Sequence, residues 1–199
     1  MGEDGGLTPA LERVRSERLV AILRRVPDVD ARVSALADAG VGVVEITLDD
    51  PDAAAAIERA RSRGDVTVLA GTVRRAEQVD LAAAAGAEAV VSPGFAREVV
   101  ERAAALGVPA VPGALTPTEV ETAWIAGAAL VKLFPGRLGG PAYVRELLAP
   151  LADVPLLVTG GIDSTNARAY LDAGAVAVGA GSALEDPAEA RRLIEAVRG

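Results

Sequence analysis

The chain has 199 residues, of which 28 are acidic and 20 basic, and its formal net charge at pH 7 is -8. This charge and the lack of any basic cluster argue against nucleic acid and anionic membrane as partners, because both bind positive surfaces. The absence of cysteine and histidine excludes disulfides, thiolate chemistry, His-based triads and histidine zinc sites.

The N-terminal stretch "MGEDGGLTPALERVRSE" carries acids where a secretory signal has basic residues, and no apolar run approaches the length of a membrane span. We therefore expect a cytoplasmic protein. No change of composition divides the chain, so residues 1–199 are predicted to form one domain. A short helix is predicted over residues 7–17, ahead of the first strand.

A unit of one helix followed by one strand recurs along the chain. It is seen in "AGVGVVEIT" from Ala39, "AGAEAVVSPG" from Ala85, "AGAALVKLFPG" from Ala126 and "AGAVAVGAG" from Ala173. In each stretch a glycine ends a helix and a Val-rich strand follows. Such helix-ending glycines are predicted at Gly40, Gly64, Gly86, Gly107, Gly127 and Gly174.

Strands are predicted, in chain order, at residues 19–23, 42–47, 66–70, 89–92, 109–111, 130–133, 156–159 and 176–179. The Ala-rich helices between them have predicted N-caps at Asp50, Thr116 and Asp163. Apolar strands alternating with helices indicate a parallel sheet covered on its outside. Eight such units favour an α/β protein with a closed (β/α)8 TIM barrel. An open doubly wound sheet is the structural alternative.

In a barrel of this kind the functional site lies where the strands end. Polar residues, prolines and glycines stand at the predicted strand ends and are expected to converge on one mouth. They are Arg24, Glu45, Thr72, Ser92, Pro93, Gly94, Pro112, Gly113, Lys132, Thr159, Gly160, Gly161, Gly179, Gly181 and Ser182.

Lys132 is the only lysine in the chain, and it stands inside the apolar run "ALVKLFPG". One interpretation is that its amine extends from the strand to solvent. However, every other basic residue is arginine, which indicates a requirement for an amine here. Burial or positive neighbours can make a lysine amine nucleophilic toward ketones, which arginine cannot become. We therefore predict that Lys132 forms a Schiff base.

Glu45 stands at the end of another strand on the same rim. Because histidine is absent, a carboxylate is the natural group to move protons, and Glu45 is the predicted general acid/base. The structural alternative is a buried ion pair between Glu45 and Arg24.

Two glycine-rich turns, "TGGIDSTNA" and "VGAGSAL", precede the last two predicted helices. Tight turns between strands and helices need glycine in any case. As a pair at the seventh and eighth units, they instead predict a phosphate site made by Gly160, Gly161, Gly181 and Ser182, because free backbone N–H groups there attract anions.

The motifs "VAILR", "GVVEIT", "LAGTV", "VSPG", "VPGALTPTE", "VKLFPG", "TGGI" and "VGAGSAL" occur in this order from Leu19 to the end. Together they resemble the 2-keto-3-deoxy-6-phosphogluconate (KDPG) aldolases and their 4-hydroxy-2-oxoglutarate (KHG) and phosphogalactonate relatives. The resemblance implies a homotrimeric barrel and a class I pyruvate aldolase of sugar-acid catabolism, as in the Entner-Doudoroff pathway, that needs neither metal nor cofactor.

Carried over motif by motif, the resemblance implies Lys132 as the Schiff-base residue and Glu45 as the acid/base. It places Thr72 and Arg24 near the substrate carboxylate. Pro93, Gly113, Phe134 and Thr159 complete the candidate substrate-binding residues, beside the phosphate turns of Gly160, Gly161, Gly181 and Ser182.

Asp49 is a departure from the family pattern. Many gluconate-type members carry a carboxylate-binding arginine after "EVTL", whereas this chain reads "EITLDDP". Either Arg24 alone holds the carboxylate or the preferred substrate differs. Thr159 resembles the gluconate type, because the galactonate type tends to have an apolar residue there.

The expected reaction is the cleavage of KDPG to pyruvate and glyceraldehyde 3-phosphate. The alternatives within the family are cleavage of KHG or of 2-keto-3-deoxy-6-phosphogalactonate. A metal-dependent pyruvate aldolase is a second enzyme class, although no acid cluster accompanies Glu45. A trimeric scaffold that retains the barrel without activity is the non-enzymatic alternative.

Overall fold

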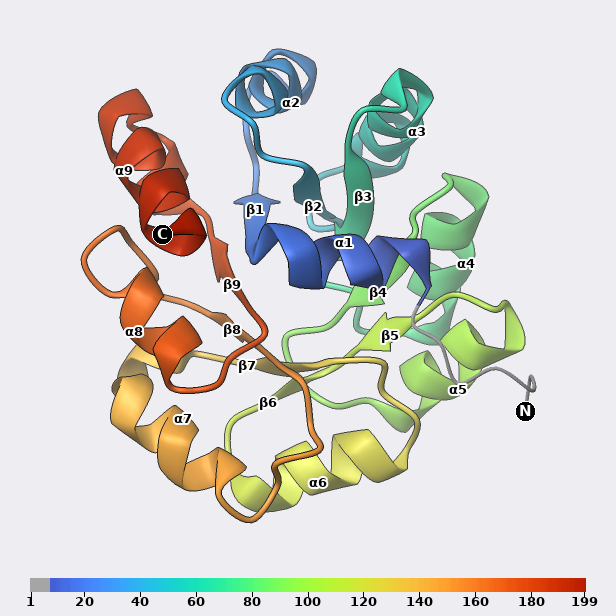
Figure 1. Cartoon of the computed structure of the whole chain (residues 1–199). Coiled ribbons are helices and arrows are strands. Elements are labelled where there is room, and N and C mark those ends of the chain that lie inside the picture. The colour runs from blue at the N-terminus through green and yellow to red at the C-terminus, as the bar shows by residue number, and fades with distance from the viewer. Residues whose placement is uncertain (1–7) are drawn as a thin grey trace.

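The computed structural model describes residues 8–199, and its strands form a parallel barrel surrounded by helices (Figure 1). The helix α1 precedes the barrel over Pro9–Glu17. Leu7, the first residue of the helix predicted over 7–17, lies outside the described residues. The strands are β1 (Leu19–Leu23), β2 (Val43–Thr47), β3 (Thr67–Gly71), β4 (Ala89–Val91), β5 (Ala110–Val111), β6 (Gly113–Ala114), β7 (Val131–Leu133), β8 (Leu156–Thr159) and β9 (Ala177–Ala180).

The helices follow the strands and lie outside them (Figure 1). They are α2 (Val29–Asp38), α3 (Ala53–Arg63), α4 (Ala76–Ala84), α5 (Arg97–Ala105), α6 (Pro117–Ile125), α7 (Gly140–Leu148), α8 (Ala167–Asp172) and α9 (Pro187–Arg198). Two short 3-10 helices are η1 (Gly136–Leu138) and η2 (Ser182–Leu184).

The sheet closes on itself through one interrupted strand. Its order is β5-β4-β3-β2-β1-β9-β8-β7-β6, so β5 and β6 stand at its two ends. These two strands are consecutive in sequence and separated only by Pro112, which has no N–H to donate to a ladder. Because β5 pairs with β4 and β6 pairs with β7, the ring is completed. The predicted (β/α)8 barrel is confirmed, and the open-sheet alternative is wrong.

The barrel has an inner and an outer apolar layer because successive strand residues face opposite sides. Inside, side chains such as Val43, Leu69 and Leu157 pack together with Leu11 and Val14 of α1. Helix α1 therefore closes the amino-terminal end of the barrel, across which it lies in Figure 1. The outward-facing residues form a second, larger cluster with the surrounding helices.

The predicted helix-ending glycines all adopt the left-handed conformation, with positive φ at Gly40, Gly64, Gly86, Gly107, Gly127 and Gly174. The helix starts are predicted less well. Thr116 is the N-cap of α6 and forms a reciprocal capping box with Glu119, as predicted. The N-caps of α3 and α8, however, are Asp52 and Asn166.

Asp50 and Asp163 are therefore wrong as helix N-caps. The Asp50 carboxylate accepts a hydrogen bond from the Asp52 N–H at 3.0 Å, and that of Asp163 accepts one from the Thr165 N–H at 2.9 Å. Each carboxylate thus closes a short turn with the residue two positions later, ahead of the helix. Aspartate commonly forms such a turn instead of capping a helix.

Within residues 8–199, no helix combines the length and the apolar character that crossing a bilayer requires.

Candidate active site

Lys132 and Glu45 face the barrel interior because of the strand alternation. Val131 and Leu133 on β7 belong to the outer layer, so Lys132 between them points inward. On β2 the outer-layer residues are Val44 and Ile46, and Glu45 points inward in the same way. Each is the middle residue of its strand rather than its last, and both side chains point into the barrel.

The two side chains meet inside the barrel. The distance from the Lys132 Nζ atom to the Glu45 Oε1 atom is 3.5 Å, and the side chains are 7% and 0% exposed. The attraction of a close carboxylate offsets part of the free-energy cost of removing the amine from water. The predicted alternative of a Glu45–Arg24 ion pair is wrong, because Arg24 pairs with Asp49 instead.

The space for Glu45 depends on a glycine in the neighbouring strand. A Cβ atom added to Gly71 would overlap the Glu45 Oε1 atom and lie only 2.6 Å from its Cγ and 2.7 Å from its Cδ atom, so any side chain at position 71 would displace this carboxylate. The Glu45 Oε2 atom and the Thr159 Oγ1 atom are buried and have no hydrogen-bond partner among the described residues. Such orphaned polar atoms are typical of a site that receives a ligand or water.

Lys132 opens into a cavity of about 660 Å³ at the carboxyl ends of the strands. Among the predicted site residues, the cavity is lined by Arg24, Thr72, Pro93, Lys132, Phe134, Thr159, Gly160, Gly161, Gly181 and Ser182. Glu45 is buried beneath the cavity surface, where its carboxylate contacts the Lys132 amine that lines the cavity. Gly113 does not line the cavity; it lies on β6, where the Pro93 carbonyl approaches too closely for a side chain.

Sequence reasoning missed two basic residues that line this cavity, Arg32 on α2 and Arg74 after β3. It also missed Glu185, the acid in the same lining. No motif marks these residues, because nothing in a helix or loop pattern distinguishes an arginine at the mouth from one in solvent. They are identified only by the three-dimensional arrangement.

Arg24 bridges two neighbours at the rim. Its Nη1 atom is 3.1 Å from the Asp49 Oδ2 atom, and its Nη2 atom donates to the Thr72 hydroxyl at 3.1 Å. Burial raises the pKa of Asp49, but the Thr47 hydroxyl and the charges of Arg24 and Arg25 outweigh it and hold this pKa below its usual value. Asp49 is therefore ionised at neutral pH and offsets part of the Arg24 charge.

The glycine turns expose backbone donors beside the cavity. Gly160 and Gly161 have φ angles of 92° and 83°, a conformation that L side chains rarely adopt. A Cβ atom on Gly161 would also lie 2.7 Å from the Arg137 side chain. Within residues 8–199, the backbone N–H groups of Gly161 and Gly181 have no hydrogen-bond partner. They are therefore available to an anion.

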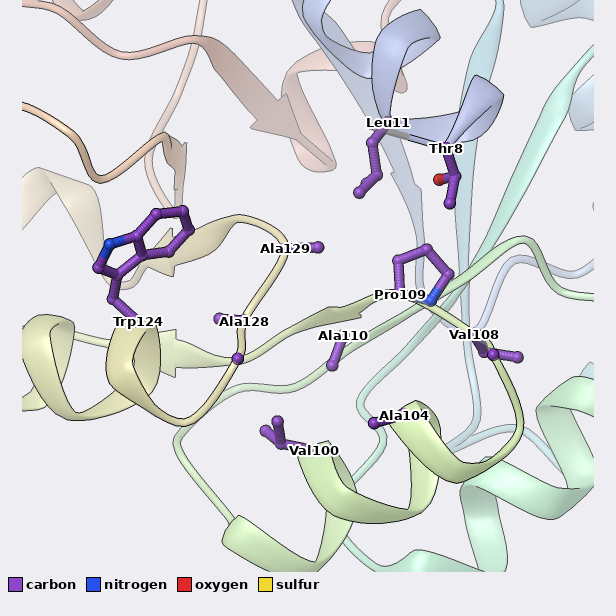
Figure 2. A pocket seen from close by; sticks show the side chains of 12 residues that line it. Thr8, Leu11, Val100, Ala104, Val108, Pro109, Ala110, Trp124, Ala128 and Ala129 are labelled. Atoms are coloured by element: carbon purple, nitrogen blue, oxygen red, sulfur yellow. The ribbon is translucent and has the colours of Figure 1, made fainter. Parts of the chain in front are cut away.

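A second cavity, of about 430 Å³, lies near the N-terminal end of α1 (Figure 2). Leu11, Val100, Val108 and Trp124 line it together with small residues, and its lining contains no charged side chain. Among the described residues, the Lys132 cavity is therefore the one of these two that holds an amine and a carboxylate for covalent or proton-transfer chemistry.

In the part of the chain that the structure describes, no three acidic side chains lie close enough together to hold a metal ion.

The family model "KDPG and KHG aldolase" matches residues 11–194 of this chain. The chain belongs to the KDPG/KHG aldolase family. It is 40% identical over 171 residues to the 2-dehydro-3-deoxy-6-phosphogalactonate aldolase of Escherichia coli strain K12, a match covering 83% of each chain. It is 42% identical over 164 residues to the 2-dehydro-3-deoxy-phosphogluconate aldolase of Treponema pallidum strain Nichols, covering 81% of this chain and 78% of the relative.

A solved structure of this aldolase family shows the same fold. The KDPG aldolase of Legionella pneumophila, with pyruvate captured at low pH as a covalent carbinolamine intermediate, superposes with a TM-score of 0.82 at 26% identity. The match covers 96% of this chain and 97% of that chain.

Proposed function

We propose that this chain is a class I aldolase that cleaves KDPG to pyruvate and glyceraldehyde 3-phosphate. The observation that carries the proposal is the buried pair of Lys132 and Glu45, 3.5 Å apart at the floor of a cavity, in a chain of this family. KHG and 2-keto-3-deoxy-6-phosphogalactonate are the alternative substrates.

The reaction begins with the transfer of a proton from the Lys132 ammonium to Glu45. The free amine then attacks the keto carbon of the substrate and forms a carbinolamine. Glu45 returns its proton to the hydroxyl group, which leaves as water, and the product is an iminium ion. The 3.5 Å separation allows this exchange after a small movement of either side chain.

Carbon–carbon cleavage follows from the electron demand of the iminium. The Glu45 carboxylate removes the proton of the substrate C4 hydroxyl, which becomes the aldehyde as the C3–C4 bond breaks. The electron pair of that bond forms a C2=C3 double bond, and the iminium becomes an enamine. The aldehyde product leaves. Protonation of C3 and hydrolysis of the resulting iminium release pyruvate and regenerate the Lys132 amine.

A pyruvate-release assay coupled to a dehydrogenase, run with KDPG, its galactonate isomer and KHG, tests this proposal. We expect turnover with KDPG that persists after treatment with EDTA. Loss of turnover in EDTA would favour the metal-dependent alternative. If none of the three substrates releases pyruvate, the proposal fails in favour of a scaffold without activity.

Arg24 is the proposed anchor for the substrate carboxylate, with Thr72 as its hydrogen-bonding neighbour. Replacing Arg24 by alanine removes a charged hydrogen bond, so the KM for pyruvate in the reverse direction should rise roughly tenfold or more. Asp49→Asn should lower this KM, because it removes the charge that offsets Arg24 while keeping an acceptor. Initial rates of aldol condensation measure both effects, and an unchanged KM in Arg24→Ala would mean that other residues hold the carboxylate.

Ser182 is a proposed phosphate ligand, beside Gly160, Gly161 and the Gly181 N–H. Ser182→Asp places a negative charge against the phosphate, so the KM for KDPG should rise by at least about tenfold while that for KHG changes little. Ser182→Asn is the matched neutral control. If Ser182→Asp raised the KM for both substrates equally, the phosphate would not bind at this end of the cavity.

The assembly is proposed to be a homotrimer in the cytoplasm. Ile125 and Leu138 support an assembly, since their large apolar side chains are 77% and 68% exposed. Light scattering coupled to size-exclusion chromatography distinguishes a trimer from a monomer or a larger particle.

A further inference from the structure

We propose that Arg32, on α2, is the cationic anchor for the phosphate group of the substrate and makes the enzyme selective for phosphorylated keto acids. The inference rests on the proposed function and adds a residue outside the glycine turns. In this proposal the Arg32 guanidinium binds the same phosphate group to which the free backbone N–H groups of Gly161 and Gly181 donate.

Arg32 lies at the end of the cavity where the turns after β8 and β9 line it. Arg32 lines the cavity together with Ser182 and also lines a neighbouring hollow with Leu184, so it shares two cavities with η2. The order of the sheet supports this placement, because β9 is the direct neighbour of β1, and α2 follows β1 in the chain. Arg32 thus approaches from α2 the turn that carries Gly181.

The state of the Arg32 side chain also favours a ligand. The residue is half-buried, yet within residues 8–199 its guanidinium has no ion pair and no hydrogen bond. Arg24, by contrast, is already held by Asp49 and Thr72. A partly desolvated guanidinium without a partner is poised for a dianionic phosphate, whose oxygens match its two parallel N–H groups.

Arg74 also lines the cavity, and within residues 8–199 its guanidinium has no ion pair or hydrogen bond, but it lies elsewhere on the rim. Arg74 follows Thr72 at the end of β3, and β1 and β2 separate this strand from β9. Arg74 is therefore on the side of Arg24, where the substrate carboxylate is proposed to bind. Glu185, the acid in the lining, follows η2, and its negative charge opposes an anion at this end, so a cation such as Arg32 would offset it there.

The test compares Arg32→Ala with Arg32→Lys and with Arg191→Ala. Arg191 lines the neighbouring hollow but not the cavity, and it supplies the matched control. For Arg32→Ala we expect the KM for KDPG to rise roughly tenfold to a hundredfold and the KM for KHG to stay within twofold. Arg32→Lys keeps the charge but not the paired N–H groups, so it should recover part of the loss. Arg191→Ala should match the wild type.

Binding of inorganic phosphate, followed by isothermal titration calorimetry, and trapping of pyruvate with borohydride give two further readouts. Arg32→Ala should lose phosphate affinity and trap pyruvate normally. The role of Arg32 would be overturned if Arg32→Ala raised the KM for KDPG and for KHG equally, or if it left phosphate binding unchanged. It would also be overturned if Arg74→Ala, instead of Arg32→Ala, showed the loss selective for phosphorylated substrate. A wild-type protein that binds phosphate but traps no pyruvate would contradict the proposed aldolase and leave the phosphate anchor standing.

Discussion

Lys132→Arg is expected to reduce aldol cleavage to the background rate while the protein stays folded. Arginine keeps the positive charge that faces the buried Glu45 carboxylate, so the ion pair is retained. It stays protonated at the pH of the assay and cannot form an imine. Lys132→Ala would be a poorer probe, since it would leave a buried carboxylate without its partner, a change that costs about 3–5 kcal/mol.

The same variant identifies the nucleophile chemically. Because Lys132 is the only lysine, incubation of the wild type with pyruvate and borohydride should give one stable adduct, seen as a single mass increment on the intact chain. The α-amino group of Met1 is the competing amine in this sequence, so peptide mapping is needed. Lys132→Arg should take up no pyruvate. An adduct that maps only to Met1, or full activity of the variant, would exclude Lys132 as the nucleophile.

Glu45→Gln is expected to lower kcat on the order of 10²-fold or more, because the amide cannot accept and return a proton. The amide is nearly isosteric with the carboxylate, so it fits the space above Gly71 and the thermal transition should stay close to that of the wild type. Circular dichroism and the coupled pyruvate assay measure the two effects separately.

Glu45→Asp provides the matched control. It keeps a carboxylate but withdraws it by one methylene from Lys132, so it should retain more activity than the amide and less than the wild type. Near-normal turnover of Glu45→Gln would assign Glu45 to a purely structural ion pair.

The sequence determines the local structure of this protein to a large extent. Regular spacing of glycines such as Gly40 and Gly174 marks the helix ends, since only glycine readily adopts positive φ. The alternation of side chains along strands then sends Lys132 and Glu45 inward, and the unique lysine identifies itself by composition alone.

The boundaries of elements are predicted less well, because competing local hydrogen bonds are close in energy. Asp50 closes a turn rather than capping α3, which begins only after Asp52. The fifth predicted strand ends at Val111, whereas the structure continues it beyond Pro112 to Ala114. A proline ordinarily ends a strand, but here each half of the strand pairs with a different neighbour.

Only the tertiary structure decides which charged groups meet. Glu45 and Lys132 are 87 residues apart in the chain, and the closing of the barrel brings them to 3.5 Å. The sequence left Arg24 open to Glu45, but its partner is Asp49. Arg32 carries no motif at all, and it reaches the cavity because α2 follows β1, the strand that lies beside β9 in the closed ring. Periodicity fixes the face on which a side chain lies, while the partner it finds depends on the curvature and closure of the whole sheet.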